Sequence, residues 1–312
     1  SVVLNTGSYY NSISNNYLKT TETSIVGKTH STLVLGGANY NNIKDNYVTN
    51  DGVNAIYLSL YGSGKFSGGL CYFNNITGNT VTCLIDNPTS WNYGVQMMGA
   101  NNKAFNNSVT GTYRGISSSG NNNDIISNNV SGVIGDYGIY GSDNSTISGN
   151  TITKTTSTAA IYTLSNSKVS NNNINVKGST MGIQSAGSNI NISDNTINTI
   201  SGTDVYTMGQ FSNIIINNNT LTSSSATPIL IKKQSSSKYP DKITITNNKI
   251  TGTTTYAIDA REAGSTYLIR DNTITGNGTI GYPTQSNTTN GSGFNGKEYT
   301  ITPAELAERL GQ

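Results

Sequence analysis

Charged residues and histidine are both scarce in this 312-residue chain. Only 11% of the residues are Asp, Glu, Lys or Arg, and the formal net charge is +2. A disordered tail or a nucleic-acid-binding surface carries much more charge, so the composition argues against both. The single histidine, His30, argues against a His-based catalytic triad and against a zinc site built from several histidines.

Cysteines and long hydrophobic runs are also scarce. The two cysteines, Cys71 and Cys83, are compatible with a disulfide or with two buried thiols, and there is no CxxC metal-binding pair. No apolar run approaches the roughly 18 residues that a membrane span needs. The sequence also lacks a signal peptide and a Met at position 1. We therefore expect a mature segment or a fragment of a longer protein.

Asn, Ser, Thr, Gly and Ile dominate what remains, and one phrase recurs. It reads "ISGNTI" at residues 147–152, "ISDNTI" at 192–197 and "IRDNTI" at 269–274. The asparagine of this phrase returns at intervals of 21 to 33 residues along the chain. The recurring residues are Asn16, Asn46, Asn79, Asn107, Asn128, Asn150, Asn172, Asn195, Asn219, Asn248 and Asn272. Such internal periodicity is typical of a solenoid.

Large aliphatic residues flank almost every recurring asparagine. The residues three positions before it and two positions after it are Ile, Val or Leu in every copy except at Ala104. A second phrase follows nine to sixteen residues later and joins a small residue to an aliphatic one, as in Gly138-Ile139 and Ala160-Ile161. The β-branched content and the spacing predict three short strands in each repeat.

Three short strands cannot bury a core alone, but stacked copies can. Each strand would pair with its counterpart one coil later, which gives three parallel sheets around one aliphatic core. We therefore predict an all-β fold: a single parallel β-helix over residues 1–282, with about 11 coils. The usual chirality of parallel connections predicts a right-handed helix.

The recurring asparagine is predicted to lie at a corner between two strands. Such corners often need a left-handed backbone conformation, which Asn tolerates. Identical amides stacked one coil apart can also bond to one another, so we predict asparagine ladders that build the fold. A second corner is predicted at Asn101, Asn122, Asn144, Asn166, Asn189 and Asn213.

The rhythm stops after Ile274, and residues 283–312 are predicted to be a separate region. A polar stretch is followed by "YTITPAELAERLGQ". There Thr302 is a plausible N-cap, with Pro303 and Glu305 in the first turn. We expect a polar linker and a short helix, which either caps the solenoid or begins a further module.

The phrases "SGNTIT" and "DNTITGN" resemble the right-handed β-helix repeats of large secreted surface proteins. They are most similar to the Asn- and Thr-rich adhesin-like proteins of methanogenic archaea, over roughly residues 1–280. The resemblance implies a non-enzymatic rod, extracellular at the cell surface and part of a larger protein. Its implied partner is a glycan or a protein on another cell, without nucleic acid or membrane insertion. It implies no catalytic residues.

The same coil also supports polysaccharide lyases, glycoside hydrolases and phage tailspikes, which are the alternatives. The Arg-x-Pro-x-x-Arg phrase of pectate lyases and the four motifs of polygalacturonases are absent. The best local cluster is Asp259, Arg261 and Glu262, and Asp136 and Asp143 form a second candidate pair. We interpret both chiefly as solvated loop charges. The calcium-binding phrase Gly-Gly-x-Gly-x-Asp is also absent, and we expect no cofactor and no metal.

The more promising candidate is a strip of outward-facing residues. In the second phrase the aliphatic residue points inward, so the next residue points outward. These residues are Tyr57, Gln96, Ser117, Tyr140, Tyr162, Gln184, Tyr206, Leu230 and Asp259. The tyrosines and glutamines suit an extended glycan, although such ladders also stabilise solenoid faces without a ligand. Trp91 and Tyr93, in an insertion, are two further candidate binding residues.

Overall fold

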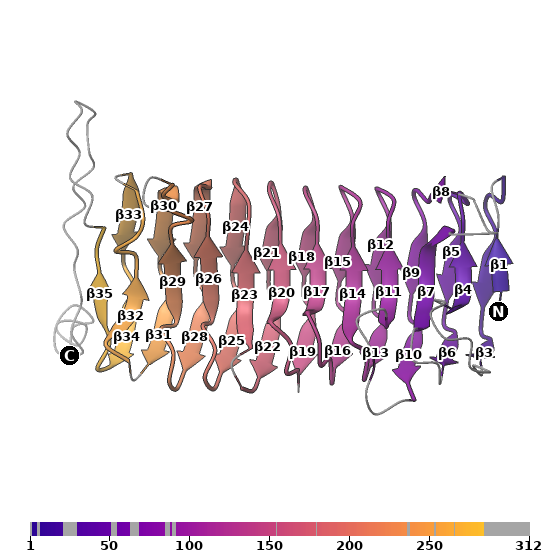
Figure 1. Cartoon of the computed structure of the whole chain (residues 1–312), viewed down its shortest axis with the longest axis horizontal. Coiled ribbons are helices and arrows are strands. Elements are labelled where there is room, and N and C mark those ends of the chain that lie inside the picture. Colours follow the sequence, from indigo (N-terminus) through magenta and orange to yellow (C-terminus); the bar gives the residue numbers. More distant parts are fainter. Residues whose placement is uncertain are drawn as a thin grey trace, which may run out of the picture.

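The computed structural model describes residues 2–4, 7–20, 30–50, 55–62, 69–84, 88, 92–153, 155–178, 180–235, 238–252, 254–264 and 266–283. All elements in these ranges are β-strands, arranged in three sheets. The strands lie side by side along the long axis of the molecule, and the chain passes once through each sheet per coil (Figure 1). We name each sheet after its first strand.

Sheet 1 has 13 strands. They are β1 (Val2–Leu4), β4 (His30–Leu35), β7 (Ala55–Gly62), β11 (Tyr93–Met97), β14 (Arg114–Ser118), β17 (Tyr137–Gly141), β20 (Ala159–Thr163), β23 (Met181–Ser185), β26 (Val205–Met208), β29 (Ile229–Lys232), β32 (Tyr256–Asp259) and β35 (Thr279–Gly281), with β8 (Gly69–Leu70) antiparallel to β7.

Sheet 2 has 11 strands. They are β2 (Ser12–Ser14), β5 (Asn42–Lys44), β9 (Asn75–Thr77), β12 (Lys103–Phe105), β15 (Asp124–Ile126), β18 (Thr146–Ser148), β21 (Lys168–Ser170), β24 (Ile190–Ser193), β27 (Ser212–Asn217), β30 (Asp241–Thr246) and β33 (Tyr267–Arg270).

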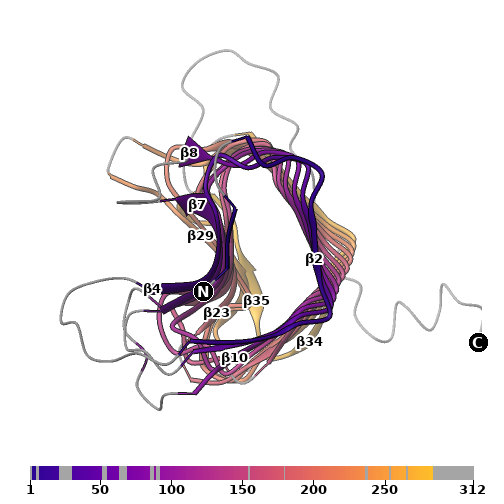
Figure 2. The same cartoon turned by 90° about the vertical axis from the view of Figure 1, so that its right-hand side faces the viewer.

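Sheet 3 also has 11 strands. They are β3 (Tyr17–Thr20), β6 (Tyr47–Asn50), β10 (Thr80–Cys83), β13 (Ser108–Thr110), β16 (Asn129–Ser131), β19 (Thr151–Thr153), β22 (Asn173–Val176), β25 (Thr196–Thr199), β28 (Thr220–Ser223), β31 (Lys249–Gly252) and β34 (Thr273–Gly276). Viewed down the long axis, sheets 1 and 2 lie on opposite sides of the cross-section, and sheet 3 lies between their ends (Figure 2).

The core is the aliphatic column that the repeat predicts. Ile147, Ile192 and Ile245 are fully buried, and Ala104 takes the same place in its coil. Register pairs each of these with its counterpart in the next coil, as in Ile125 with Ile147. The parallel β-solenoid expected from the sequence is therefore confirmed. Residues 284–312 lie outside the described residues, and with them the predicted C-terminal helix.

The first asparagine ladder is continuous from Asn16 to Asn272. At Asn150 the side-chain Nδ2 donates to Oδ1 of Asn172 at 3.0 Å and to the carbonyl of Ile125 at 2.8 Å. The backbone N–H of Asn150 donates to the same Oδ1 at 3.0 Å. Each amide thus ties successive coils together, and from Asn46 onward each one lies buried.

The left-handed conformation was predicted for the ladder asparagine itself, but at this corner the structure has it one residue earlier. Positive φ belongs to the residue before each ladder asparagine, such as Asn171 (57°) or Gly149 (67°). That residue turns the chain and faces solvent, so the asparagine after it can point inward. At the second corner the predicted residues, from Asn101 to Asn213, do have φ of 57–60°. The buried position that follows them changes along the rod, from Asn to Ser to Ile, as at Asn123, Ser145 and Ile190.

The two cysteines do not form a disulfide. Both remain thiols; Cys71 is buried and Cys83 is half-buried. The Cys71 thiol donates to the carbonyl of Leu35 at 2.9 Å, and burial raises the pKa of this thiol. The described residues include no helix long and apolar enough to span a membrane.

Candidate functional site

The outward positions of sheet 1 stack in register along the rod. Gln96 pairs with Ser117, Ser117 with Tyr140, and Tyr140 with Tyr162. The same line continues through Gln184, Tyr206, Leu230 and Asp259. The strip expected from the sequence is therefore a physical row from β11 to β32.

Tyr57 does not belong to this row. Ser59 pairs with Gln96, and Leu58 pairs with Val95, so Tyr57 lies two residues too early. The sequence alignment equated Ile56 with Val95, because Ala55-Ile56 has the form of the small-plus-aliphatic phrase. The β7 strand is longer than its neighbours and has a further aliphatic residue, Leu58, which pairs with Val95, whereas Ile56 pairs with Tyr93.

Three tyrosine rings form the centre of the row. Tyr140 and Tyr162 stack with ring centroids 5.5 Å apart and planes 8° apart. Tyr137, three residues before Tyr140 in β17, tilts against Tyr162 with ring centroids 4.7 Å apart. We call Tyr137, Tyr140, Tyr162, Gln184 and Tyr206 the tyrosine surface. Partial burial raises the pKa of all four tyrosine hydroxyls, so they stay neutral hydrogen-bond donors at physiological pH.

An arginine braces the N-terminal side of the tyrosine surface. The guanidinium of Arg114 lies 4.8 Å from the ring centroid of Tyr93 and donates to its hydroxyl. Its Nε donates to Oδ2 of Asp136 at 2.7 Å. The carboxylate of Asp143 has a different partner: its Oδ1 accepts a hydrogen bond from the backbone N–H of Ser165 at 2.9 Å. Asp136 and Asp143 therefore do not form the predicted carboxylate pair.

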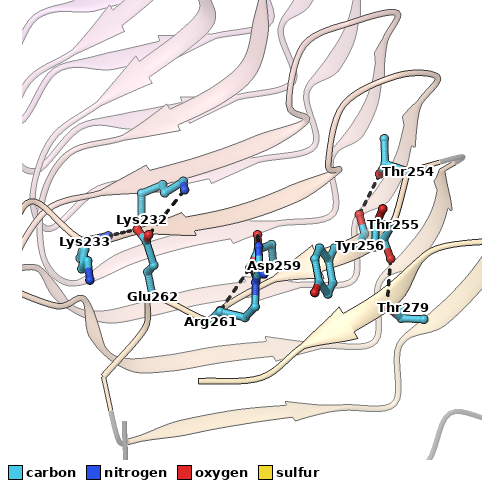
Figure 3. A network of polar contacts seen from close by, with 9 residues as sticks. All are labelled: Lys232, Lys233, Thr254, Thr255, Tyr256, Asp259, Arg261, Glu262 and Thr279. Carbon is cyan, nitrogen blue, oxygen red and sulfur yellow. Dashed lines mark hydrogen bonds and ion pairs between the residues drawn. The ribbon is translucent and has the colours of Figure 1, made fainter. Parts of the chain in front are cut away.

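A charged pocket lies at the C-terminal end of the same row. The cavity has a volume of about 350 Å³. Its lining comprises Ile231, Lys232, Lys233, Tyr239, Asp259, Arg261 and Glu262. Since Asp259 occupies the row position after Leu230, the pocket continues the line of the tyrosine surface. The predicted cluster of Asp259, Arg261 and Glu262 is therefore brought together, and Lys232 and Lys233 lie beside it (Figure 3).

Ion pairs occupy both carboxylates of the charged pocket. Arg261 donates from Nε and Nη2 to the two oxygens of Asp259, at 2.9 and 2.8 Å, and Lys232 lies 3.7 Å from Glu262 (Figure 3). Partial burial opposes ionisation of Asp259. The hydrogen bonds and charge of Arg261 outweigh it, so the pKa of this carboxyl is lower than usual. An ionised Asp259 cannot act as the general acid that glycoside hydrolysis requires.

The repeat region matches one known family, described as right handed beta helix region, over residues 93–239 and 182–295. This chain belongs to the right-handed β-helix family. The match agrees with the handedness that chain chirality predicts, and it supports the β-helix part of the adhesin-like resemblance but nothing narrower. No curated protein matches this chain.

Two solved structures resemble this β-helix remotely. A mannuronic acid specific polysaccharide family 6 lyase from human gut microbiota is 13% identical, with a TM-score of 0.43, and 99% of this chain aligns with 87% of that one. A polygalacturonase from Erwinia carotovora ssp. carotovora is 12% identical, with a TM-score of 0.24, and 92% of this chain aligns with 84% of that one. Likeness at this level carries no argument about activity.

The insertion aromatics do not form an exposed patch in the described part of this β-helix. Tyr93 opens β11 and is only 8% exposed, with its hydroxyl bound to Arg114. Its ring is therefore covered by a side chain of the neighbouring coil. Trp91 lies outside the described residues.

Sequence reasoning missed several residues of the β-helix site. Tyr137 and Arg114 directly precede the small-plus-aliphatic phrase, and this position was the only signal, because strict alternation from Tyr140 and Ser117 would turn both inward. Lys232, Lys233 and Tyr239 had no such signal. They reach the pocket from β29 and from the segment after it.

Proposed function

We propose that this β-helix binds an extended polysaccharide along the outer face of sheet 1, as an extracellular, non-enzymatic domain of adhesin type. The tyrosine surface supports this function most directly. Tyrosine presents an apolar ring and a neutral hydroxyl, and sugars present C–H faces and hydroxyls in the same way. The natural partner would be a glycan, or a glycosylated protein, on another cell.

Two features of the tyrosine surface favour a polymeric ligand. The row repeats once per coil, because Tyr140, Tyr162, Gln184 and Tyr206 follow one another in register. A repeating row matches a repeating polymer better than an irregular protein surface. The rings are also held in place by mutual contact, as between Tyr140 and Tyr162 at 5.5 Å. Binding therefore costs little side-chain entropy.

The test uses substitutions that the chain itself contains at equivalent positions. Tyr140→Ser copies Ser117, its register partner, and Tyr162→Gln copies Gln184. Both variants should fold normally. Each should bind the polysaccharide about tenfold more weakly, because each loses one aromatic contact. Binding is measured on a glycan array and then by calorimetry on the full chain. Asn173→Thr on sheet 3, which copies Thr151 and Thr196, is the matched control.

The proposal fails if the full chain binds no polysaccharide on the array. It also fails if the double variant Tyr140→Ser, Tyr162→Gln binds as tightly as the parent chain. An equal loss in the Asn173→Thr control would show that the effect comes from the fold and not from the tyrosine surface.

Cleavage of an acidic polysaccharide is the second candidate, and the charged pocket favours it. Lys232, Lys233 and Arg261 line the cavity together with Tyr239. In β-elimination from a uronate, cations neutralise the sugar carboxylate and a base removes the proton on the adjacent carbon. The glycosidic C–O bond on the next carbon then breaks, so that its oxygen leaves as a hydroxyl and a C=C bond forms. Incubation with alginate or polygalacturonate would then give unsaturated products that absorb in the ultraviolet. Lys233→Gln should slow their release at least about tenfold. Absence of products, with binding retained, rejects this candidate.

A further inference from the structure

Exposed aromatic side chains gather around the first three strands of sheet 2, far from the tyrosine surface. Tyr10, Tyr40 and Phe73 stack in one column, with ring centroids 5.3 and 5.0 Å apart. They are 79%, 45% and 46% exposed. Tyr17 and Tyr47 form a second column at the opposite corner, with centroids 5.2 Å apart and planes 7° apart. We call these five residues the aromatic corners.

The backbone shows that the first column is not a requirement of the fold. Tyr10 and Tyr40 have φ of 58°, and Phe73 has φ of 57°. This left-handed conformation is unfavourable for bulky residues and tolerable for Asn. The same corner position is asparagine in the next six coils, at Asn101, Asn122, Asn144, Asn166, Asn189 and Asn213, and Lys242 in the coil after them. Strain of this kind concentrates at functional sites, so the aromatic residues have a purpose that the corner itself does not explain.

Polar and nearly neutral side chains separate the two columns. The ends of β2, β5 and β9 place Ser12, Asn42, Asn75 and Thr77 there, half-buried or exposed. The adjacent charges, Lys44 and Asp45, neutralise each other at 3.5 Å. The surface thus combines apolar rings with amides and hydroxyls and has no excess charge.

We infer that the aromatic corners form a second carbohydrate site, which takes a neutral oligosaccharide across the first three coils. The inference does not depend on the function proposed for sheet 1, since the columns flank β2 on the other side of the solenoid from β7 and β29 (Figure 2). A protein partner would need a contiguous apolar core, whereas the polar strands divide this surface. A sugar chain suits it, because aromatic contacts recur once per coil and hydrogen-bonding groups lie between them.

Two sites on opposite sides would let one rod hold two glycan chains at once. When both chains belong to the same cell surface, binding of one raises the effective concentration of the rod for the other, which strengthens attachment without any new contact. This arrangement is what an attachment domain needs.

The test restores the residue that later coils use. The triple variant Tyr10→Asn, Tyr40→Asn, Phe73→Asn is made in the full chain, with and without Tyr140→Ser and Tyr162→Gln. Neutral hexasaccharides of glucose, mannose, xylose and N-acetylglucosamine are the probes, measured by calorimetry. At least one should bind the chain that lacks the sheet 1 tyrosines. The triple substitution should weaken that binding about tenfold or more. The thermal midpoint should stay level or rise, because the strain is relieved.

Three results would overturn the inference. In the first, none of the four hexasaccharides binds. In the second, binding is unchanged after the triple substitution. In the third, the parent chain sediments as a dimer and the triple variant sediments as a monomer. The last would assign the aromatic corners to self-association. Loss of binding caused only by the sheet 1 substitutions would support the proposed function and reject this second site, so the two failures are distinguishable.

Discussion

At Asn150 a single side chain serves groups in three successive coils. Its Oδ1 accepts from both the backbone N–H and the Nδ2 of Asn128, at 2.8 and 3.0 Å. Its Nδ2 donates back to Ile125 and onward to Asn172. Because the site is dry, none of these groups could turn to water if the amide were removed.

Asn150→Ala should therefore lower the free energy of unfolding by roughly 2–4 kcal/mol, since it leaves a buried N–H and a buried carbonyl without a hydrogen-bond partner. Urea unfolding followed by circular dichroism measures the change. Asn173→Thr is the control, because Asn173 faces solvent in β22 and should cost less than about 0.5 kcal/mol. Equal losses for the two variants would contradict a structural role for the ladder.

Asp204 is the one carboxyl among the described residues that is fully buried. Its Oδ1 accepts from the Thr199 hydroxyl at 2.9 Å, and its Oδ2 has no partner in the described structure. Burial raises the pKa of Asp204 well above its usual 3.8, so folding favours the protonated form. The stabilisation is complete below the unfolded pKa and is lost as pH rises toward the folded value.

Asp204→Asn should remove this pH dependence. The thermal midpoint of the variant, relative to the parent chain, should rise as the pH increases above the unfolded-state pKa of about 4. Calorimetric scans at several pH values give the difference, which cancels the contribution of carboxyls common to both chains. A difference that stays constant with pH would show that Asp204 does not titrate in this range.

The ladder asparagines were readable from sequence because their spacing and aliphatic flanks recur in every coil. The residue with the left-handed conformation could not be identified from the sequence, because it varies among Asn, Asp, Ser and Gly, as at Asp194 and Ser127. Periodicity locates a corner, but the choice of which residue bends depends on which side chain points inward. That choice follows from hydrogen bonds to the neighbouring coil, which a single repeat does not contain.

At the scale of the strand, close approach in sheet 1 depends on glycine. A Cβ on Gly115 would lie 2.2 Å from the carbonyl oxygen of Gly138 and 2.7 Å from Cγ1 of Val130. The first contact is backbone in the next coil, and the second is core. Neither can move without shifting a neighbouring strand.

Gly115→Ala should therefore lower the free energy of unfolding by about 1–3 kcal/mol through overpacking. Ser131→Ala in β16 is the control: its hydroxyl contacts only the exposed Thr110 hydroxyl, at 3.3 Å, so the expected change is within about 0.5 kcal/mol. Thermal and urea unfolding measure both. A neutral Gly115→Ala would mean that β14 and β17 can separate freely at this point.

Strand register also explains how much of the candidate site was predictable. The row from Gln96 to Asp259 follows from alternation, since a residue after a buried aliphatic must face outward. The register assigned to Tyr57 was wrong because β7 contains three aliphatic residues, Ile56, Leu58 and Leu60, and only pairing with β11 shows that Leu58 lies beside Val95. Only part of the charged pocket was predicted. Asp259 and Arg261 lie close together in the sequence, whereas Lys233 and Tyr239 come from another coil.

For the whole molecule, stability is a sum over coils and the contacts between neighbours. No single centre exists whose loss unfolds everything, because every coil buries its own aliphatic residues against the next. The described coils between Asn107 and Asn219 are nearly uniform in length, with ladder separations of 21 to 24 residues. A uniform solenoid should therefore tolerate removal of one complete coil.

Deletion of residues 108–128 joins Asn107 to Asn129 and removes one 21-residue repeat in register. Asn107 then takes the place of Asn128 beside Asn150, and the tyrosine surface from Tyr137 onward is untouched. The shortened chain should keep its β-type circular dichroism and a cooperative transition, with a midpoint lower by only a few degrees. The control deletion of residues 108–127 leaves one residue extra. That slip turns inward side chains outward at the junction, so it should abolish the cooperative transition. If both deletions behave alike, coil register does not determine the stability of this rod.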